Sequence, residues 1–250
     1  MSIEYAASNG IARILLNRPD KRNAITSEMM IALHSAFERA TNDAAIRVLL
    51  IRGAGRDFCA GLDLSEVLKS AEDATESLAS ARRLGDLYLA MRRHPKPIVA
   101  AVQGRALGGG AGIATASDLI VASESAQFGY PEVKLGFIPA IVATMLRRAV
   151  NERQAMELAL TGEPISAARA HAIGLINRVY SDAEFDTGVE TYTAALAANS
   201  MSAMSLSKKL LYETEAMPFE ASIEAGVQAN VQARMTDDFK RGVERFLKKD

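Results

Sequence analysis

The sequence contains a single cysteine, Cys59, among its 250 residues. One thiol cannot form an intramolecular disulfide, and it cannot supply a cysteine-rich zinc site. A chain of this length does not need either, because it can bury about three quarters of its unfolded surface in a core. A low cysteine content also suits a reducing compartment, so we expect a cytoplasmic protein.

Neither sign of charge is in excess. The 29 Lys and Arg residues nearly balance the 30 Asp and Glu residues, which gives a formal net charge of −1. No positive surplus is available to neutralise a phosphate backbone, so nucleic acid is not expected as a partner. A hydrophobic fraction of 49% argues against intrinsic disorder.

Long hydrophobic runs are missing as well. Each apolar stretch is interrupted by Arg, Asp, Gly or Pro before it reaches the length of a membrane span. The N-terminal residues lack the basic and apolar segments of a secretory signal. The sequence therefore predicts no association with a membrane.

The first half of the chain combines strand and helix patterns, as in an α/β protein. Residues 26–40 have the periodicity of an amphipathic helix. Short apolar, β-branched runs predict strands at residues 11–17, 48–52, 97–102 and 119–122. Between the last two strands, the glycine-rich residues 104–117 predict a turn followed by a helix, which makes a parallel crossover unit.

From about Ile138 onward the strand pattern disappears and helical periodicity dominates. The helices expected there cover residues 140–150, 152–160, 183–198, 202–215, 219–235 and 237–249. We therefore expect an α/β core over residues 1–195 and a C-terminal helical region over residues 196–250.

The glycine-rich segment does not match the common phosphate loops. No lysine follows its glycines as a Walker loop requires, and the spacing of a dinucleotide fingerprint fails at Ile113 and Thr115. What remains is a backbone that a ligand can approach closely, with free N–H groups at the start of a helix. Such groups suit a developing negative charge, and tight helix packing is the alternative.

Two further segments contain candidate groups. One segment follows a strand, precedes a helix and therefore also presents backbone N–H groups: Phe58-Cys59-Ala60-Gly61-Leu62-Asp63-Leu64. We interpret its Cys59 as a packing residue, since no histidine is placed to activate it. Glu132 lies between Pro131 and Val133. Its carboxylate could occupy a dry pocket that raises its pKa into the range of a general base, or it could be a solvated loop residue.

Other polar residues are interpreted as structural. His34, His94 and His171 lie outside these segments, and Asp118 stands at the start of a predicted strand. No G-x-S-x-G motif supplies a serine nucleophile.

Taken together, these segments resemble the crotonase superfamily, also called the enoyl-CoA hydratase/isomerase family. The resemblance runs nearly end to end. It covers residues 17–24, 55–63, 104–118, 126–139, 160–162 and 172–176, with a tail ending near Phe246. It implies a spiral of ββα units followed by helices that assemble a homotrimer or homohexamer. It also implies acyl-CoA substrates, with CoA as part of the substrate and no metal or redox cofactor.

The resemblance assigns roles to individual positions. The backbone N–H groups of Ala60 and Gly109 would bind the thioester oxygen as it gains enolate charge, and Glu132 would move the proton. Contacts with substrate or CoA are implied for Arg22, Ala24, Ala60, Gly61, Leu62, Asp63, Gly109 and Tyr130. Tyr130 has aromatic packing as its alternative role, and the terminal Lys248 and Lys249 could approach the CoA phosphates of this or a neighbouring subunit.

Gly112 departs from the hydratase pattern, in which this position holds a second glutamate. A general acid or base contributes roughly 10²- to 10⁴-fold, so the missing group handicaps hydration. One glutamate suffices to move a double bond, and both reactions stay open because some hydratase-like branches also have glycine here. The alternatives are a non-catalytic acyl-CoA-binding paralogue and a thioester hydrolase or decarboxylase of the same fold.

A second departure follows Pro139, where many members of the family have a glycine run. Here the chain has Ile141 and Val142 instead. These bulkier side chains predict an altered acyl pocket, suited to branched or short chains.

Overall fold

The computed structural model describes residues 1–248 and has a six-stranded main sheet. The strand order is β1-β2-β3-β4-β6-β9; β1 and β2 form an antiparallel hairpin, and all later neighbours are parallel. These strands span Ile3–Ser8, Ile11–Leu16, Val48–Gly53, Ile98–Val102, Leu119–Ser123 and Arg178–Tyr180. The four strands expected from the sequence are all present, and the crossover from β4 to β6 is confirmed.

A second, smaller sheet has the order β5-β7-β8, formed by Arg105–Leu107, Gln127–Gly129 and Ile165–Ser166. The chain alternates between the two sheets. It leaves β4 for β5 and then helix α4 (Gly109–Ala116), and it leaves β6 for β7 and then the short helix η2 (Pro131–Leu135). After β3 the chain follows the same pattern. Cys59 pairs with Ala106 of β5 in an isolated β-bridge, and helix α2 (Leu64–Ser70) comes next. This confirms the expected spiral of ββα units.

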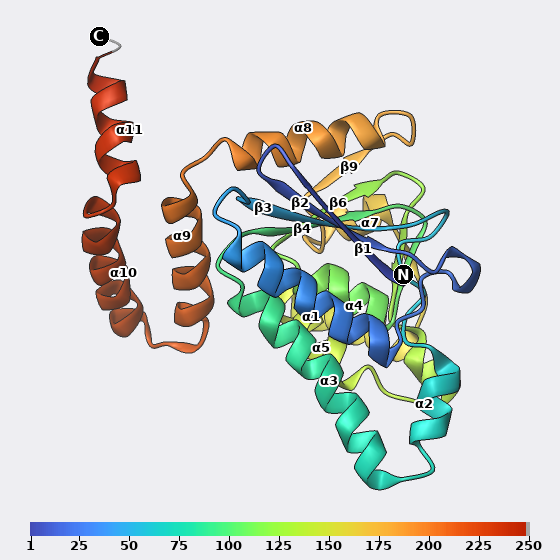
Figure 1. Cartoon of the computed structure of the whole chain (residues 1–250). Helices are drawn as coiled ribbons and strands as arrows, with labels where there is room; N and C mark the ends of the chain where they lie inside the picture. The colour runs from blue at the N-terminus through green and yellow to red at the C-terminus, as the bar shows by residue number, and fades with distance from the viewer. Residues whose placement is uncertain (249–250) are drawn as a thin grey trace.

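Helices cover both faces of the main sheet (Figure 1). One face packs against α1 (Ser27–Asn42), α3 (Ala74–Arg93), α4 and α5 (Ala140–Ala149), and the opposite face packs against α8 (Phe185–Ala197). Every residue of β4 is buried, as its continuously apolar sequence predicts. Burial on both faces makes the sheet a rigid platform for the loops at its edge.

The C-terminal region consists of α9 (Met201–Glu213), η3 (Thr214–Ala216), α10 (Phe219–Arg234) and α11 (Asp237–Leu247). Figure 1 shows these helices standing beside the core rather than over the sheet. Neither α10 nor α11 contains a buried residue in the single chain. Helix α8 still packs on the sheet up to Ala197, just past the expected boundary at 195.

Several elements were not expected. The second half of the chain is not free of strands, because it contains β8 and β9, and β5 lies inside the segment predicted as a turn. Strands of two or three residues are too short to show an alternating pattern. Helices α3, α6 (Glu152–Thr161) and α7 (Ala167–Ala172) complete the fold; α6 was predicted, whereas α3 and α7 were not. The last helix ends at Leu247, and Lys249 lies outside the described residues.

Within residues 1–248, no helix combines the length and apolar character needed to cross a membrane.

Candidate active site

The parallel pairing brings three segments to one edge of the smaller sheet. Cys59, β5 and β7 are neighbours there, through the bridge to Ala106 and the β5–β7 ladder. Segments that run parallel end at the same edge, so the residues that follow each of them meet. The candidate site is thus formed by residues 60–62, 108–109 and 130–132, which are far apart in the sequence.

The first segment presents a free N–H group at Leu62, not at Ala60. The Ala60 N–H donates to the Arg22 carbonyl at 2.9 Å, whereas the Leu62 N–H has no hydrogen-bond partner among the described residues. Gly61 lies between them with φ +109°, a conformation that favours glycine and reverses the direction of the backbone. The hydrogen bond does not favour Ala60 as an oxyanion donor, because its N–H is already used, whereas the Leu62 N–H is available.

Gly109 supplies a second free N–H as the first residue of α4. Gly108 precedes it with φ +50° and donates its own N–H to Gly129 at 2.9 Å. The N–H groups of the first helical turn have no acceptor within the helix, and the helix dipole makes them attractive to negative charge. A Cβ added at Gly109 would lie 3.5 Å from the Leu62 nitrogen. The two free donors are therefore close neighbours.

The carboxyl group of Glu132 faces the same place. One of its oxygens, Oε1, lies 3.0 Å from the position that a Cβ on Gly108 would occupy. The other, Oε2, is buried and accepts no hydrogen bond from any described residue. Burial raises the pKa of Glu132 above its usual value. An unpaired carboxylate with a raised pKa beside two backbone donors is a suitable proton carrier.

The segments expected to contact CoA run side by side. Ile25 and Leu62 form a parallel bridge, so residues 22–25 lie along residues 60–62. Arg22 has φ +50°, and its side chain is exposed. Arg18 donates to the Ala24 carbonyl at 2.6 Å. These contacts fix the backbone of both segments.

Asp63 and Tyr130 have structural partners. Asp63 caps α2 by accepting from the Ser65 N–H at 3.1 Å, and it pairs with Arg18 at 3.1 Å. Tyr130 is completely buried, and its hydroxyl lies 2.9 Å from the Thr115 hydroxyl. This placement favours the packing role for Tyr130; its contact with substrate stays a prediction.

Cys59 is a packing residue. It is completely buried, its Sγ lies 3.1 Å from the Asn23 carbonyl oxygen, and burial raises the pKa of its thiol to about 12. A thiol in this environment is not a nucleophile at neutral pH.

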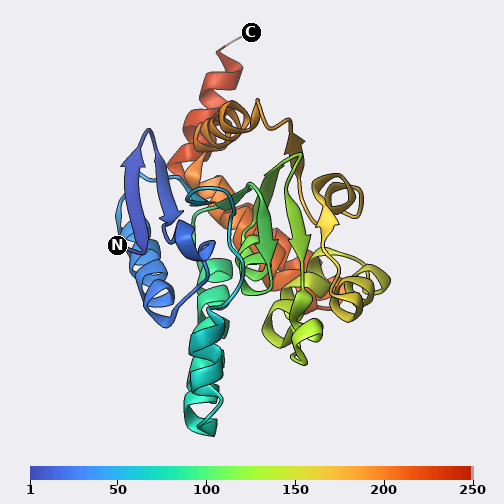
Figure 2. The same cartoon turned by 90° about the vertical axis from the view of Figure 1, so that its right-hand side faces the viewer.

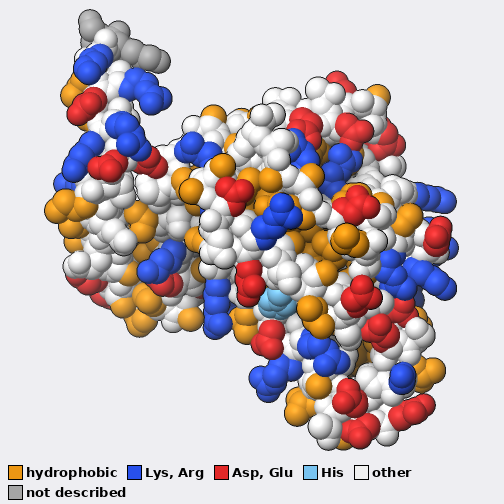
Figure 3. Space-filling view, viewed as in Figure 1, with side chains coloured by type: hydrophobic (Ala, Val, Ile, Leu, Met, Phe, Trp, Pro, Cys, Tyr) orange, Lys and Arg blue, Asp and Glu red, His pale blue; other side chains and the backbone are white. Residues whose placement is uncertain are grey.

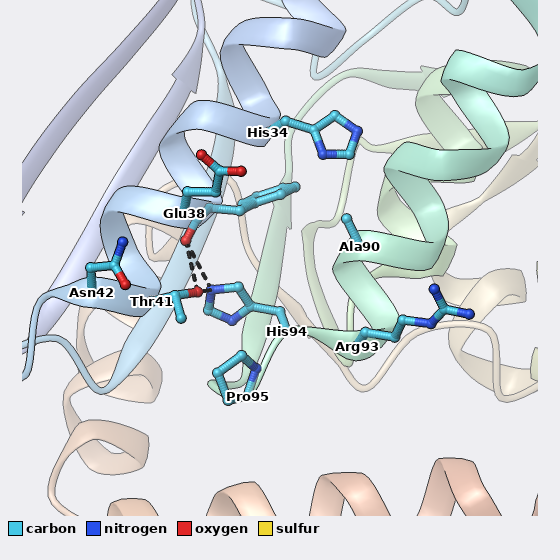
Figure 4. Close-up of a pocket in the computed structure, with 9 residues that line it drawn as sticks. His34, Glu38, Thr41, Asn42, Ala90, Arg93, His94 and Pro95 are labelled. Carbon is cyan, nitrogen blue, oxygen red and sulfur yellow. Dashed lines mark hydrogen bonds between the residues drawn. The ribbon is translucent and has the colours of Figure 1, made fainter.

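The histidines lie apart from the site. Figure 4 shows His94 directed toward Thr41, in a pocket between α1 and the end of α3. Its Nε2 lies 3.0 Å from the Thr41 hydroxyl, its Nδ1 accepts the Lys96 N–H at 3.1 Å, and burial lowers its pKa. His171 uses Nδ1 to contact the Ile176 carbonyl at 3.1 Å. The structural interpretation of both residues is consistent with these contacts.

Other groups can be placed relative to the site. Figures 1 and 2 place the end of α11 far from α4, so the exposed Lys248 does not approach the site of its own chain. No group of three or more His, Cys, Asp or Glu side chains in the described part of the chain is arranged to hold a metal ion.

Sequence comparisons show to which family the chain is similar. The model of the enoyl-CoA hydratase/isomerase family matches residues 6–250. The enoyl-CoA hydratase EchA19 of Mycobacterium tuberculosis is 36% identical over 238 residues, covering 94% of this chain and 90% of that protein. The 1,2-epoxyphenylacetyl-CoA isomerase of Escherichia coli K12 is 32% identical over 243 residues, covering 96% and 93%.

A comparison of folds gives the same result. The crystal structure of human enoyl Coenzyme A hydratase domain-containing protein 3 superimposes with a TM-score of 0.95 at 28% identity, covering all of this chain and 98% of that chain. With its ββα spiral, its glycine-rich helix start and its half-buried glutamate, this chain belongs to the enoyl-CoA hydratase/isomerase family and is an enzyme of hydratase/isomerase type.

Proposed function

We propose that this enzyme moves a proton on an acyl-CoA thioester through an enolate, with Glu132 as the only carboxylate that carries the proton. The observation that supports this is the Glu132 carboxylate, one oxygen of which has no partner among the described residues, beside the free N–H groups of Leu62 and Gly109. The two donors would bind the thioester oxygen, and they stabilise it most when it carries the enolate charge. Losing one such donor typically costs ~10²- to 10³-fold in rate.

The reaction that suits one base is migration of a double bond from the 3 to the 2 position. Glu132 removes a proton from C2, and the electron pair is delocalised over the thioester oxygen and the double bond. The same carboxylic acid then returns the proton at C4, so the carboxylate is regenerated. Because these steps balance without an electron acceptor, the proposal includes no cofactor, and CoA enters as part of the substrate.

Hydration is the second candidate, and it is favoured by the hydratase names of relatives such as EchA19. It requires a water molecule that attacks C3, normally with help from a second proton carrier. Position 112 is glycine and supplies none. The absence of this group handicaps hydration by roughly 10²- to 10⁴-fold, so we place double-bond migration first.

The CoA arm would lie along the paired segments 22–25 and 60–63. Its pantetheine amide can reach only backbone groups that the fold leaves free. The Ala60 N–H is not one of them, because it already donates to the Arg22 carbonyl. Lys248 would approach CoA phosphates only from a neighbouring subunit. The cytoplasmic location stays a prediction from the low cysteine content.

We also propose that the C-terminal helices pack against further copies of the chain. On α10, Phe219, Ile223, Val227 and Val231 repeat every four residues and are 49–76% exposed. Figure 3 shows hydrophobic side chains gathered over this tail. A continuous apolar stripe is costly to leave in water, and a homotrimer or homohexamer would cover it.

Mass spectrometry in D₂O tests the proposed reaction. Short 3-enoyl-CoA and 2-enoyl-CoA are incubated with wild type, Glu132→Gln and Glu152→Gln; Glu152 is an exposed carboxylate on α6 and serves as the control. We expect wild type and the control to shift the double bond with deuterium incorporation. The rate of Glu132→Gln should be lower by ~10²- to 10⁴-fold.

Each other outcome has a distinct meaning. Accumulation of 3-hydroxyacyl-CoA in the wild-type reaction would show hydration without a second glutamate. Release of free CoA or carbon dioxide would indicate a hydrolase or a decarboxylase. Tight binding without any exchange would indicate a non-catalytic acyl-CoA-binding protein.

A further inference from the structure

Glu132 belongs to a stretch of chain whose own residues do not enter the core. None of residues 131–141 is buried, although this stretch contains η2 and the proposed proton carrier. The buried residues that flank it in the sequence are Tyr130 on one side and Val142 on the other. The position of the Glu132 carboxyl group therefore depends on how the two ends of this exposed segment are held.

Tyr130 is the end that lies closer to Glu132. It is completely buried, and it immediately precedes Pro131, the first residue of η2. Peptide bonds are planar and the proline ring fixes φ, so only the ψ rotations of Tyr130 and Pro131 separate the Cα atoms of Tyr130 and Glu132. The placement of Tyr130 thus determines where η2 begins.

The Tyr130 hydroxyl links this point of the chain to helix α4. Its Oη lies 2.9 Å from Thr115 Oγ1, and the Thr115 hydroxyl donates its own proton to the Ala111 carbonyl at 2.7 Å. A hydroxyl has a single proton to give, so Tyr130 is the donor to Thr115. Burial raises the pKa of Tyr130 more than the hydrogen bond with Thr115 lowers it, so the phenol keeps the proton that this bond requires.

The helix that receives this hydrogen bond also carries one of the proposed oxyanion donors. Gly109 is the first residue of α4, and Ala111 and Thr115 follow in the same helix. Backbone hydrogen bonds join successive turns of a helix, so α4 moves as one unit. The hydroxyl of Tyr130 therefore connects the segment that carries Glu132 to the element that carries the Gly109 N–H.

The backbone hydrogen bonds nearby hold other parts of the chain. Gly108 donates to the Gly129 carbonyl at 2.9 Å, which fixes the end of β7 before Tyr130. Phe137 donates to the Glu132 carbonyl at 3.0 Å, and both of these residues lie within the exposed segment. The first bond acts before Tyr130 and the second closes the segment on itself, so the Tyr130 hydroxyl is the last buried link to α4 before Glu132.

We propose that Tyr130 is a positioning residue for the proton carrier. Its hydrogen bond to Thr115 holds Glu132 at a fixed distance from a thioester bound at the start of α4. Tyr130 acts through the backbone of Pro131 and Glu132. Misplacing a reacting group by about 1 Å can cost ~10²-fold in rate, so one hydrogen bond behind the carrier is enough to affect catalysis. This inference rests on the proposed function.

The test compares Tyr130→Phe with wild type in double-bond migration and in deuterium exchange at C2 of a short 3-enoyl-CoA. Phenylalanine keeps the buried ring and removes only the hydroxyl, and Thr115 keeps its bond to Ala111. We expect kcat to fall about 10-fold, which is less than the loss of the base itself, with KM within about 2-fold because the donors are unchanged.

A pH–rate profile adds a measurement that a change in packing alone would not move. A loosened segment admits water to the Glu132 carboxyl group, and hydration brings its raised pKa back toward the usual glutamate value. We therefore expect the acid limb of kcat/KM in Tyr130→Phe to lie at a lower pH than in wild type.

Variants at Thr115 test the hydrogen bond itself. Thr115→Ser keeps the acceptor and should rescue the wild-type kcat, whereas Thr115→Val removes the acceptor and should lower kcat as Tyr130→Phe does. Both losses come from one bond, so the double variant should be no slower than the slower single variant. Tyr212→Phe is the matched control: it removes a hydroxyl that donates to Asp118 at 2.7 Å, outside the candidate site, and should keep the wild-type kcat and acid limb.

The outcomes distinguish this inference from the proposed function. If Glu132→Gln is as fast as wild type, both are overturned. If Glu132→Gln is slow but Tyr130→Phe keeps the wild-type kcat or acid limb, the positioning role is overturned while the proposed function stands. Losses that multiply in the double variant overturn it as well. Near-ultraviolet circular dichroism checks that Tyr130→Phe is folded, and Thr115→Val provides the same comparison if it is not.

Discussion

Glu132 lies in a place where its carboxylate is poorly solvated. Its pKa is raised by burial, and one of its oxygens is unpaired among the described residues. A general base works only when it is deprotonated. We therefore expect kcat/KM to fall as the pH drops through the raised pKa of Glu132, at a higher pH than for an ordinary glutamate. A pH–rate profile with an acid limb at the usual glutamate value would contradict this.

The same pKa predicts an effect on stability. The folded state binds the Glu132 proton more tightly than the unfolded state, so this group makes the free energy of unfolding decrease as the pH rises through the two pKa values. Glu132→Gln removes this penalty. The melting temperature of Glu132→Gln minus that of wild type, measured by differential scanning calorimetry, should increase from acidic to neutral pH. A difference that is constant with pH would argue against the buried charge.

Gly112 is a position where the smallest possible enlargement should be harmful. In Gly112→Ala, the new methyl group would collide with Tyr88 and Val142. Overpacking costs about 1–3 kcal/mol, and alanine recovers ~1 kcal/mol of helix propensity, so we expect a net loss of up to about 2 kcal/mol in urea unfolding. Gly85→Ala is the matched control, because Gly85 lies in α3 with nothing within 4 Å; it should gain about 0.5–1 kcal/mol. Equal effects in both variants would disprove the collision.

At the scale of elements, one buried ion pair joins helix α9 to the core. Lys208 is 9% exposed and donates to Asp118 at 2.8 Å and to the Met91 carbonyl at 3.0 Å. Asp118 also accepts the Ile98 N–H at 2.7 Å, at the start of β4. This network ties α9 to the core, and it confirms the structural interpretation of Asp118.

Removing one partner of this pair should be costly. Lys208→Met leaves Asp118 buried without its cation, and breaking a buried pair costs about 3–5 kcal/mol. The neighbouring Lys209 makes only an exposed pair with Glu213 at 3.7 Å, so Lys209→Met should cost less than about 0.5 kcal/mol. Urea unfolding of both variants checks this, and similar losses would show that Lys208 does not anchor α9.

At the scale of the whole molecule, the exposed stripe on α10 predicts self-association. We expect wild type to elute as an assembly of several chains in size-exclusion chromatography with light scattering. Val227→Glu should shift it to the mass of one chain, because a charge cannot be buried unpaired in an apolar interface. Leu78→Glu, at a residue of α3 that is 62% exposed, should leave the mass unchanged. A wild-type protein that is already monomeric would refute the association.

Local patterns were enough to identify much of this protein. The patterns of strands β2, β3, β4 and β6 lie in residues that are adjacent in the sequence, and so do those of the helices in the second half. Both could therefore be predicted. The spaced glycines and Glu132 also indicated the family, because backbone approach and a carboxylate are chemical requirements that show in residue type.

Other features depend on contacts between distant residues. Very short strands such as β8 are held by their neighbours in the smaller sheet, not by their own pattern. The choice of Leu62 over Ala60 as a donor depends on which N–H the Arg22 carbonyl already occupies. By its sequence pattern, Tyr88 is an ordinary core residue of an amphipathic helix. Only the packing of α3 against α4 places its hydroxyl at the Gly109 carbonyl. Such roles follow from which atoms meet in space, and residues separated by many positions in the chain have no local signal for that.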